Sequence, residues 1–385
     1  MKTWILSFLC LFFLLEVGIA NPLSRFRTVD IDPAVGEVCY AVDVADVNGD
    51  GRKDIIAVTE NRVLWYENPS WQGHVILEDQ TVRDNVCIAP FDIDGDGAID
   101  FALGAGWTRV GTLQWIARGQ SLKDKWNVHA ITAEPWLHRV RWGDVLQQGK
   151  QQLVISPLNR TQGDGVRLMV LEIPGDPAED AWPLTVIDHS LNRLHNHWIT
   201  DLDDDGKEDI LTASQEGITL FQRKGSAWRK TRISPGNPSS EPEERGTGEV
   251  KTGRLADGGK IIATIEPMHG HSVVVYTEKS GWERRVLDDT YGQGHAVWLA
   301  DLNSDGNDEV IAGHREEGKG AVSEPGIFIY QAEDSSGEKW TRTILDQGGM
   351  AVEDLVATDI NGDGRIDIIA GGRATHNVRL YLNVE

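Results

Sequence analysis

A nine-residue acidic pattern occurs five times in this chain. Each copy reads Asp-x-[Asp/Asn]-x-Asp-Gly-x-x-[Asp/Glu] and is followed by a short run of apolar residues. The copies begin at Asp46, Asp92, Asp201, Asp301 and Asp359. Self-similarity at a fixed period is typical of repeat architectures, in which each unit forms one small piece of a larger array. The repeats therefore constrain the fold more than any other feature of the sequence.

Two further units keep the strand–turn–strand pattern but have lost most of its carboxylates. One contains Asp144 and the apolar residues 153–155, and the other contains Arg254 and the apolar residues 261–263. The total is seven units spaced roughly 46 to 58 residues apart, a length that suits four short strands. No segment shows sustained helical periodicity. We therefore predict an all-β fold, a seven-bladed β-propeller of four-stranded blades.

The outer strands predict how the ring closes. Six units end in an outer strand with a Trp or similar anchor, but the last unit has none after it. The segment Phe26–Ile31 has the same pattern as these outer strands. We expect it to pair with Asn377–Leu382 and to leave no free sheet edge. Residues 21–385 then form one domain.

The N-terminus has the features of a secretory signal peptide. Lys2 precedes an apolar run over residues 4–15, and small residues lead up to a plausible cut after Ala20. We expect residues 1–20 to be removed and the protein to be secreted or periplasmic, with no membrane association after cleavage. Cys39 and Cys87 then remain, and the sequence leaves open whether they pair or stay as separate buried thiols.

The charge of the chain excludes some partners. The formal net charge is −23, which argues against nucleic acid and anionic membranes. Much of this charge lies in the acidic loops, so bound cations would cancel part of it.

The repeats carry a family resemblance. The Asp-x-[Asp/Asn]-x-Asp-Gly-x-x-Asp units, each followed by an apolar strand, resemble the FG-GAP/VCBS repeats of integrin-like propellers. The histidine-rich units are also similar to the propeller domain of aldos-2-ulose dehydratases. The first resemblance covers nearly the whole chain after residue 20 and implies Ca²⁺ in the repeat loops.

The acidic loops have the ligand chemistry of a hard cation. Oxygen atoms at alternate positions of a tight turn, with Gly at position six, suit Ca²⁺. The alternative is a network of Asx-turns, in which the carboxylates cap backbone N–H groups without metal. The candidate ligands are Asp46, Asn48, Asp50, Asp54, Asp92, Asp94, Asp96, Asp100, Asp201, Asp203, Asp205, Asp209, Asp301, Asn303, Asp305, Glu309, Asp359, Asn361, Asp363 and Asp367.

Histidines gather at the opposite end of the predicted blades. Of the 11 histidines, His138, His195 and His295 each lie six residues before the first residue of a turn that follows an inner strand. Inner strands line the central channel of a propeller, so these three side chains converge on one pore mouth. Five more histidines are expected at the same end, namely His197, the His269/His271 pair, and His314 and His376 in comparable turns.

This pore mouth is a candidate metal or ligand site. Converging imidazoles suit Zn²⁺, Mn²⁺ or Fe²⁺, and we expect His138, His195, His197, His269, His271 and His295 to supply the ligands. The alternative is a polar vestibule that solvates the strand ends. Other polar or aromatic residues expected at this rim are Glu249, Glu266, Glu353, Asp354, Arg160, Arg315, Arg373, Trp107 and Trp136.

Two functions fit these features. The first is a secreted, metal-assisted lyase or dehydratase acting on an oxidised sugar or glycoside, with Glu353, Glu266, Arg160 and Arg315 as candidate catalytic residues. The second is a non-catalytic, calcium-binding propeller that recognises carbohydrate or protein. Either way, a carbohydrate or small polar ligand is the expected partner, with a protein partner as an alternative.

Overall fold

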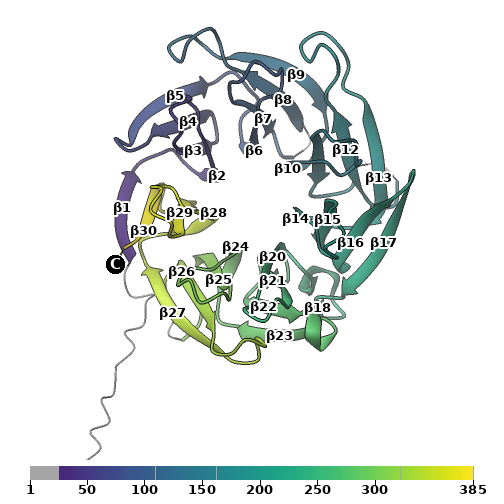
Figure 1. Cartoon of the computed structure of the whole chain (residues 1–385), viewed down its shortest axis with the longest axis vertical. Coiled ribbons are helices and arrows are strands. Elements are labelled where there is room, and N and C mark those ends of the chain that lie inside the picture. Colours follow the sequence, from purple (N-terminus) through teal and green to yellow (C-terminus); the bar gives the residue numbers. More distant parts are fainter. Residues whose placement is uncertain (1–25, 109, 162, 321, 385) are drawn as a thin grey trace, which may run out of the picture.

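Four-stranded antiparallel sheets repeat seven times around a central axis in the computed structural model (Figure 1). The structure describes residues 26–108, 110–161, 163–320 and 322–384. The predicted signal peptide, residues 1–20, lies outside these residues. The seven-bladed propeller predicted from the sequence is confirmed.

Each blade runs from an inner strand at the axis to an outer strand at the rim. The inner strands are β2 (Cys39–Ala45), β6 (Asn85–Phe91), β10 (Leu137–Gly143), β14 (Asn196–Thr200), β20 (Glu249–Arg254), β24 (Gly292–Ala300) and β28 (Val352–Thr358). The second strands are β3 (Asp54–Thr59), β7 (Asp100–Ala105), β11 (Gln152–Pro157), β15 (Asp209–Ser214), β21 (Lys260–Glu266), β25 (Glu309–Glu316) and β29 (Asp367–Gly372). The third strands are β4 (Arg62–Glu67), β8 (Thr112–Ala117), β12 (Val166–Glu172), β16 (Gly217–Lys224), β22 (Ser272–Thr277), β26 (Gly326–Ala332) and β30 (Val378–Asn383). The outer strands are β5 (Gln72–Glu78), β9 (Asn127–Ala133), β13 (Leu184–Leu191), β17 (Ala227–Ser234), β23 (Glu283–Asp288), β27 (Trp340–Gln347) and β1 (Phe26–Asp32).

The connections before and within the fifth blade contain short strands and 3-10 turns. A two-stranded ribbon, β18 (Asn237–Pro238) with β19 (Arg245–Gly246), precedes it and encloses the 3-10 turn η2 (Pro242–Glu244). A second turn, η3 (Glu278–Ser280), joins its third and outer strands. Among the described residues, no helix is long and apolar enough to cross a membrane.

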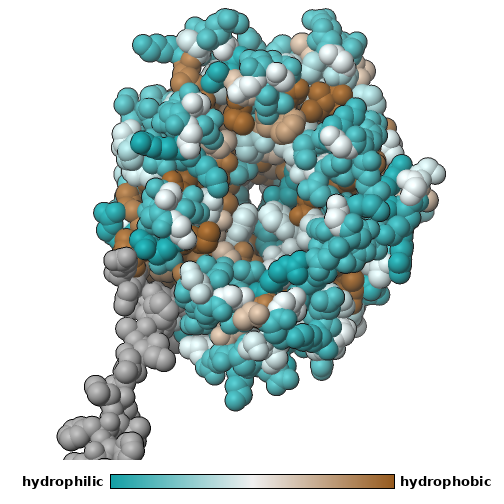
Figure 2. Space-filling model, in the orientation of Figure 1, coloured by the Kyte–Doolittle hydropathy of each residue, from teal (hydrophilic) through white to brown (hydrophobic). Residues whose placement is uncertain are grey.

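The core lies between neighbouring blades. The second and third strands are buried on both faces, because each sheet packs against the sheets on either side of it. One apolar cluster, for example, joins Ile261 and Val275 of the fifth blade to Val310 and Phe328 of the sixth. This packing fixes the angle between blades and hence the width of the central channel. Figure 2 shows the molecule hollowed at the centre of the ring.

The N-terminal strand closes the ring as predicted. β1 pairs antiparallel with β30, with Phe26 opposite Asn383 and Asp32 opposite Val378. Its partly buried apolar side chains pack against the cores on both sides of the seventh blade. The third strand here begins at Val378 rather than at the predicted Asn377, whose side chain donates a hydrogen bond to the Gly349 carbonyl oxygen between β27 and β28.

His138, His195 and His295 lie at or near the start of inner strands, and the five acidic loops follow the ends of inner strands. The two features therefore lie at opposite ends of the ring. Cys39 is the first residue of β2, Cys87 lies on the neighbouring inner strand β6, and both are free and buried. Of the two alternatives for the cysteines, separate buried thiols is the one found.

Closure of the ring predicts a large effect of removing β1. Deleting residues 21–32 exposes the edge of β30 and removes Phe26, Val29 and Ile31 from the core. Since each partly buried apolar side chain contributes about 1–2 kcal/mol, we expect the free energy of unfolding to fall by roughly 3–5 kcal/mol in denaturant titrations. Deleting only residues 21–25 is the control and should leave it nearly unchanged. Equal stability of both truncated proteins would show that closure does not depend on this strand.

Candidate functional site

Seven equivalent backbone positions surround the pore mouth. Each lies six residues before the first residue of the turn that follows the inner strand. They are Tyr40, Val86, His138, His195, Glu249, His295 and Glu353. In five of the seven blades the pairing register between inner and second strand shifts at this position, so that the residue has no partner across the ladder. A β-bulge of this kind turns the side chain out of the regular alternation. The bulges thus direct side chains of the first three and last two blades toward the axis.

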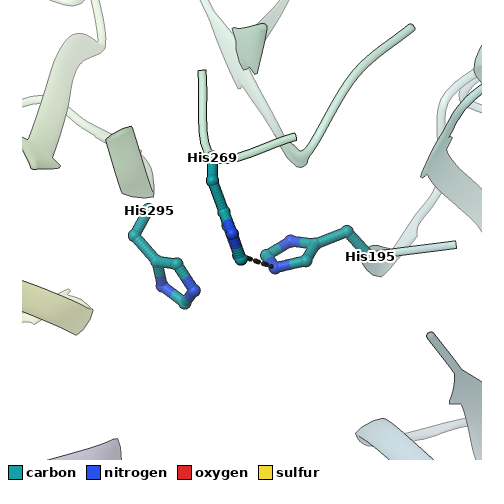
Figure 3. Close-up of side chains that lie close together, drawn as sticks. All are labelled: His195, His269 and His295. Carbon is teal, nitrogen blue, oxygen red and sulfur yellow. Dashed lines mark hydrogen bonds between the residues drawn. The ribbon is translucent and has the colours of Figure 1, made fainter. Parts of the chain in front are cut away.

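Three imidazoles meet at this mouth (Figure 3). His195 directly precedes β14, His269 lies in the turn after β21, and His295 lies near the start of β24. Their ring centroids are 4.8 to 5.2 Å apart, and one nitrogen from each lies within 4.8 Å of the others. His269 has a left-handed backbone, φ 52°, in its turn. We name these three residues the imidazole cluster.

Hydrogen bonds to the second ring nitrogen orient two of the cluster's rings. The Nδ1 of His195 lies 2.9 Å from the Gly248 carbonyl oxygen and 2.9 Å from Oε1 of Glu249. The Nδ1 of His295 lies 2.5 Å from the Glu353 carbonyl oxygen. Since a carbonyl only accepts, both rings carry their proton on Nδ1 and present the Nε2 lone pair to the cluster. This is the arrangement that metal-binding histidines adopt.

His269 links the cluster to an arginine. Its Nε2 lies 3.0 Å from Nε2 of His195, and Nη2 of Arg315 lies 3.3 Å from its Nδ1. Because the guanidinium only donates, His269 in this arrangement carries its proton on Nε2 and donates it to His195. Holding a cation would require that proton to leave Nε2 and the Arg315 contact to loosen. Arg315 is therefore coupled to whatever the cluster binds.

The electrostatics of the site keep the imidazoles neutral. Burial, followed by the charge of Arg315, places the pKa of His295 well below its usual value. Burial and the charge of Arg139 do the same for the pKa of His138. Burial also lowers the pKa of His195 and of His269. Neutral imidazole is the form that ligates metals. His195 and His295 are therefore ready to do so, whereas His269 must first move its proton from Nε2.

Glu249 supports the cluster from behind. Burial alone would raise its pKa, but the hydrogen bond from His195 and the charge of Arg139 lower it to about 2. Nη2 of Arg139 lies 3.3 Å from its Oε1, and Asn196 donates to its Oε2. A carboxylate behind a histidine raises the basicity of the ring and fixes its orientation.

The cluster fits a tetrahedral transition metal. A Zn²⁺ ion with ligand distances of about 2.0–2.1 Å would place its nitrogens about 3.3 Å apart. The Nε2 atoms of His195 and His269 are 3.0 Å apart, and a nitrogen of His295 lies within 4.8 Å of the others, so modest side-chain shifts would bring all three to one ion. Three nitrogen donors leave one position open, which is the pattern of catalytic rather than structural zinc. Oε1 of Glu353 lies 3.9 Å from Nε2 of His295, and both residues line the cavity described next.

A cavity of about 70 Å³ adjoins the cluster. Glu353 faces it and is held by two ion pairs, 2.6 Å to Nη1 of Arg315 and 2.8 Å to Nη1 of Arg373. Tyr40 and Trp107 form other parts of the wall. The cavity thus combines a carboxylate, two guanidiniums and aromatic rings beside the three imidazoles, which suits a small polar ligand.

Some predicted site residues lie elsewhere. His138 lines the cavity but is not in the cluster, since its Nδ1 bonds to the His195 carbonyl oxygen. His197 packs against the third blade, where the Ser156 hydroxyl lies 2.8 Å from its Nδ1. His271, two residues past His269, is half-buried and makes no side-chain hydrogen bond within the described residues. The structure therefore brings together three of the six predicted ligands.

The two remaining candidate catalytic residues are also outside the cavity. Glu266 is fully buried within the fifth blade, where Thr264, Tyr276 and Arg284 engage its carboxylate. Burial raises its pKa despite the nearby Arg284. Arg160 is exposed after β11 and is not among the residues that line the cavity.

Other residues expected at the rim divide in the same way. His314 packs between the rings of Tyr291 and Phe328 inside the sixth blade. His376 is exposed, and its Nδ1 lies 2.6 Å from the Glu37 carbonyl oxygen. Trp136 makes an edge contact with Trp107, with ring centroids 6.0 Å apart. Asp354 lines the central channel rather than the cavity beside the imidazole cluster.

The acidic loops form closed turns at the opposite end of the inner strands. In each of the five copies the first aspartate accepts a hydrogen bond from the N–H of the glycine five residues later. That glycine is left-handed in every copy, with φ between 78° and 88°. Carboxylate oxygens cluster within 4.8 Å in two loops, through Asp92, Asp94 and Asp100 and through Asp201, Asp203 and Asp205.

The degenerate loop at Asp144 shows that this turn does not need the full set of carboxylates. Asp144 accepts hydrogen bonds from the N–H groups of Gln148 and Gly149, both at 2.8 Å, just as in the acidic copies. Hydrogen bonding alone therefore maintains the turn. The further carboxylates of the five copies remain candidates for calcium, which stays a prediction.

Calcium binding would leave a signature in stability. Burial raises the pKa of Asp100, the last residue of its loop, to about 6. Because this folded-state pKa exceeds the unfolded value of about 3.9, the group stabilises the calcium-free protein at low pH and loses that contribution as pH rises through about 6. A cation would offset the loss. We therefore expect added Ca²⁺ to raise the melting temperature of EDTA-treated protein, and to do so more at about pH 7.5 than at about pH 5.

A matched pair of variants separates calcium from hydrogen bonding. Asp94→Asn weakens the cluster in the second blade and should shrink the calcium-dependent rise in melting temperature. Asp144→Asn weakens a turn without such a cluster and should lower stability while leaving that rise intact. If Ca²⁺ and EDTA have no effect at any pH, the turns are held by hydrogen bonds only.

Comparison with known proteins confirms both resemblances seen in the sequence. A family model for FG-GAP-like repeats matches residues 46–103 and 301–370, and one for the β-propeller domain of aldos-2-ulose dehydratase matches residues 110–279. Aldos-2-ulose dehydratase from Phanerodontia chrysosporium is 24% identical over 262 residues, which is 62% of this chain and 29% of that protein. The chain thus spans less than a third of that relative.

Solved structures resemble the chain in fold alone. BBS1N, solved in complex with ARL6DN, gives a TM-score of 0.55 at 12% identity. The match covers 94% of this chain and 97% of the BBS1N chain. The extracellular domain of BT4673 from B. thetaiotaomicron gives 0.51 at 11% identity, over 92% of this chain and 40% of that one.

Sequence reasoning placed Glu249 and Glu353 at the rim but missed Arg139. The sequence contains a sharper signal for the two glutamates, since both occupy the position of His195 in their own blades. Arg139 directly follows the pore-mouth position His138, and the same alignment would have found it.

Proposed function

We propose that this protein is a secreted, metal-assisted carbon–oxygen lyase that removes water from an oxidised sugar. The imidazole cluster carries this proposal, because it offers three nitrogen donors and an open side that faces a small polar cavity. The similarity to an aldos-2-ulose dehydratase supports the choice of substrate class. Calcium in the repeat loops is proposed to stabilise the ring rather than to take part in the chemistry.

His195, His269 and His295 are proposed to hold a divalent transition metal. When bound, such an ion acts as a Lewis acid that polarises a carbonyl oxygen and thereby acidifies the adjacent C–H. The chain itself positions the substrate. Arg315 and Arg373 border the cavity and donate to sugar oxygens, and the Trp107 ring covers one side.

Glu353 is the proposed base. Its carboxylate lies 3.9 Å from Nε2 of His295 and lines the same cavity. It takes the proton α to the carbonyl, and the electrons of that C–H bond form the new double bond as the C–O bond at the β carbon breaks. Glu353 then returns the proton to the departing hydroxyl, so that the products are an unsaturated carbonyl compound and water. Arg315 and Arg373 hold the carboxylate in place throughout.

Metal content and turnover test this proposal together. Wild-type protein loaded with Zn²⁺, Mn²⁺ or Fe²⁺ and then desalted should retain about one pore-mouth metal, and should convert an aldos-2-ulose to a product with the near-ultraviolet absorbance of an unsaturated carbonyl. His295→Ala should lose both the metal and turnover, since two donors do not replace three. Elemental analysis and absorbance measure the two effects.

Two further variants complete the test. His271→Ala is the matched control, because His271 is a neighbouring histidine outside the cluster, and it should keep metal and activity. Glu353→Gln should keep the metal but lose turnover by about 100-fold or more, the usual contribution of a general base. Retained metal with saturable sugar binding and no turnover in wild type would favour the alternative, a propeller that recognises carbohydrate.

A further inference from the structure

A second, larger cavity lies in the central channel. Its volume is about 350 Å³, and it shares Tyr40, Val86 and Arg139 with the cavity beside the imidazole cluster. Inner strands of all seven blades contribute to its wall. The mechanism proposed above uses none of the side chains that are unique to this cavity.

Lys251 has an unusual environment in this wall. It lies on β20, in the middle of the inner strand, and is only 5% exposed. Its Nζ lies 4.5 Å from the centre of the Trp198 ring and 5.2 Å from that of Trp298. Within the described parts of the chain, it forms neither a hydrogen bond nor an ion pair with any side chain or carbonyl. Buried lysines are almost always paired, so this amine needs an explanation.

Lys260 shows what a paired lysine looks like in the same blade. It is 7% exposed, and its Nζ lies 2.6 Å from the Leu202 carbonyl oxygen and 2.8 Å from a carboxylate oxygen of Asp204. Its amine is satisfied, and it does not line the channel cavity. Burial alone therefore does not distinguish the two lysines, whereas pairing and access to the channel do.

We propose that Lys251 is a carbonyl-reactive amine that forms an imine with a small aldehyde or ketone in the central channel. Its nitrogen lone pair adds to the carbonyl carbon, and one amine proton moves to the oxygen to give a carbinolamine. The hydroxyl then gains a proton and leaves as water, while the nitrogen loses its second proton and the C=N bond forms. No oxidant, reductant or cofactor is needed. This inference goes beyond the proposed function and does not depend on it.

The charges around Lys251 favour the neutral amine that such chemistry requires. Burial and the charge of Arg141 lower its pKa to about 7, although Glu249 and Asp354 act in the opposite direction and Arg139 adds to the decrease. The faces of the two indole rings attract an ammonium ion, and this attraction acts to raise the pKa of Lys251. A lysine that is partly neutral near pH 7 is a nucleophile, which the usual surface lysine is not.

Two carboxyl groups in the same wall can carry the protons. Burial raises the pKa of Asp43 to about 7, and burial also raises the pKa of Asp354. Both line the cavity with Lys251, and Asp43 makes no ion pair within the described residues. A carboxyl that is protonated near neutral pH supplies the acid that loss of water from a carbinolamine needs.

Reductive trapping tests this proposal on the wild-type protein. The intact chain is incubated with glycolaldehyde and sodium cyanoborohydride, digested, and analysed by peptide mass spectrometry. At about pH 7 we expect Lys251 to gain one hydroxyethyl group on the order of tenfold faster than the exposed Lys207, because a far larger fraction of its amine is neutral. Its labelling rate should be half-maximal at about pH 7 or somewhat above, since the two indole faces favour the ammonium form.

Matched variants and a defined failure complete the experiment. Lys251→Met keeps the aliphatic chain between the two indoles and should abolish the fast labelling, whereas Lys260→Met should leave it unchanged. The pH profile of wild type stands even if a variant folds poorly. The proposal is wrong if Lys251 stays unlabelled, or if its rate and pH midpoint match those of Lys207.

Discussion

Closing seven sheets around one axis forces seven equivalent residues into one small space. Each of these residues lies at or near the start of an inner strand, and in five blades a β-bulge turns its side chain out of the ladder and toward the axis. The imidazole cluster, its supporting Glu249 and the carboxylate of Glu353 all depend on this geometry. The outer parts of the blades hold the ring rigid, so the site is positioned by strands rather than by flexible loops.

Balanced charge makes this crowding tolerable. Arg139 and Arg315 face Glu249 and Glu353, so that each buried carboxylate has a guanidinium partner. Burial, followed by the charge of these guanidiniums, lowers the pKa of His138 and of His295, which leaves both imidazoles neutral. Acidic groups of the repeat loops lie at the far end of the inner strands. The length of one inner strand therefore separates the carboxylate oxygens of the acidic loops from the histidine nitrogens of the pore mouth.

The repeat period predicted the fold because each repeat specifies four short strands, and such units pack into few possible architectures. The absence of an outer strand after the last unit correctly predicted that Phe26–Ile31 closes the ring. Spacing also identified His195 and His295, since a position in a repeat becomes a position on a ring. Spacing did not separate His269 from His271, because a left-handed turn decides which of them faces inward. Contacts across blades, such as His197 with Ser156, join residues 41 positions apart, and one sequence contains no signal for them.

X-ray absorption at the zinc edge tests the central claim, that three imidazoles from three blades form one metal site. Protein loaded with one equivalent of Zn²⁺, with calcium present to occupy the acidic loops, should show a first shell at about 2.0–2.1 Å and the outer-shell scattering of three imidazole rings. A shell composed of oxygen atoms without imidazole scattering would place the zinc in an acidic loop. That result would contradict a metal site formed by His195, His269 and His295 at the pore mouth.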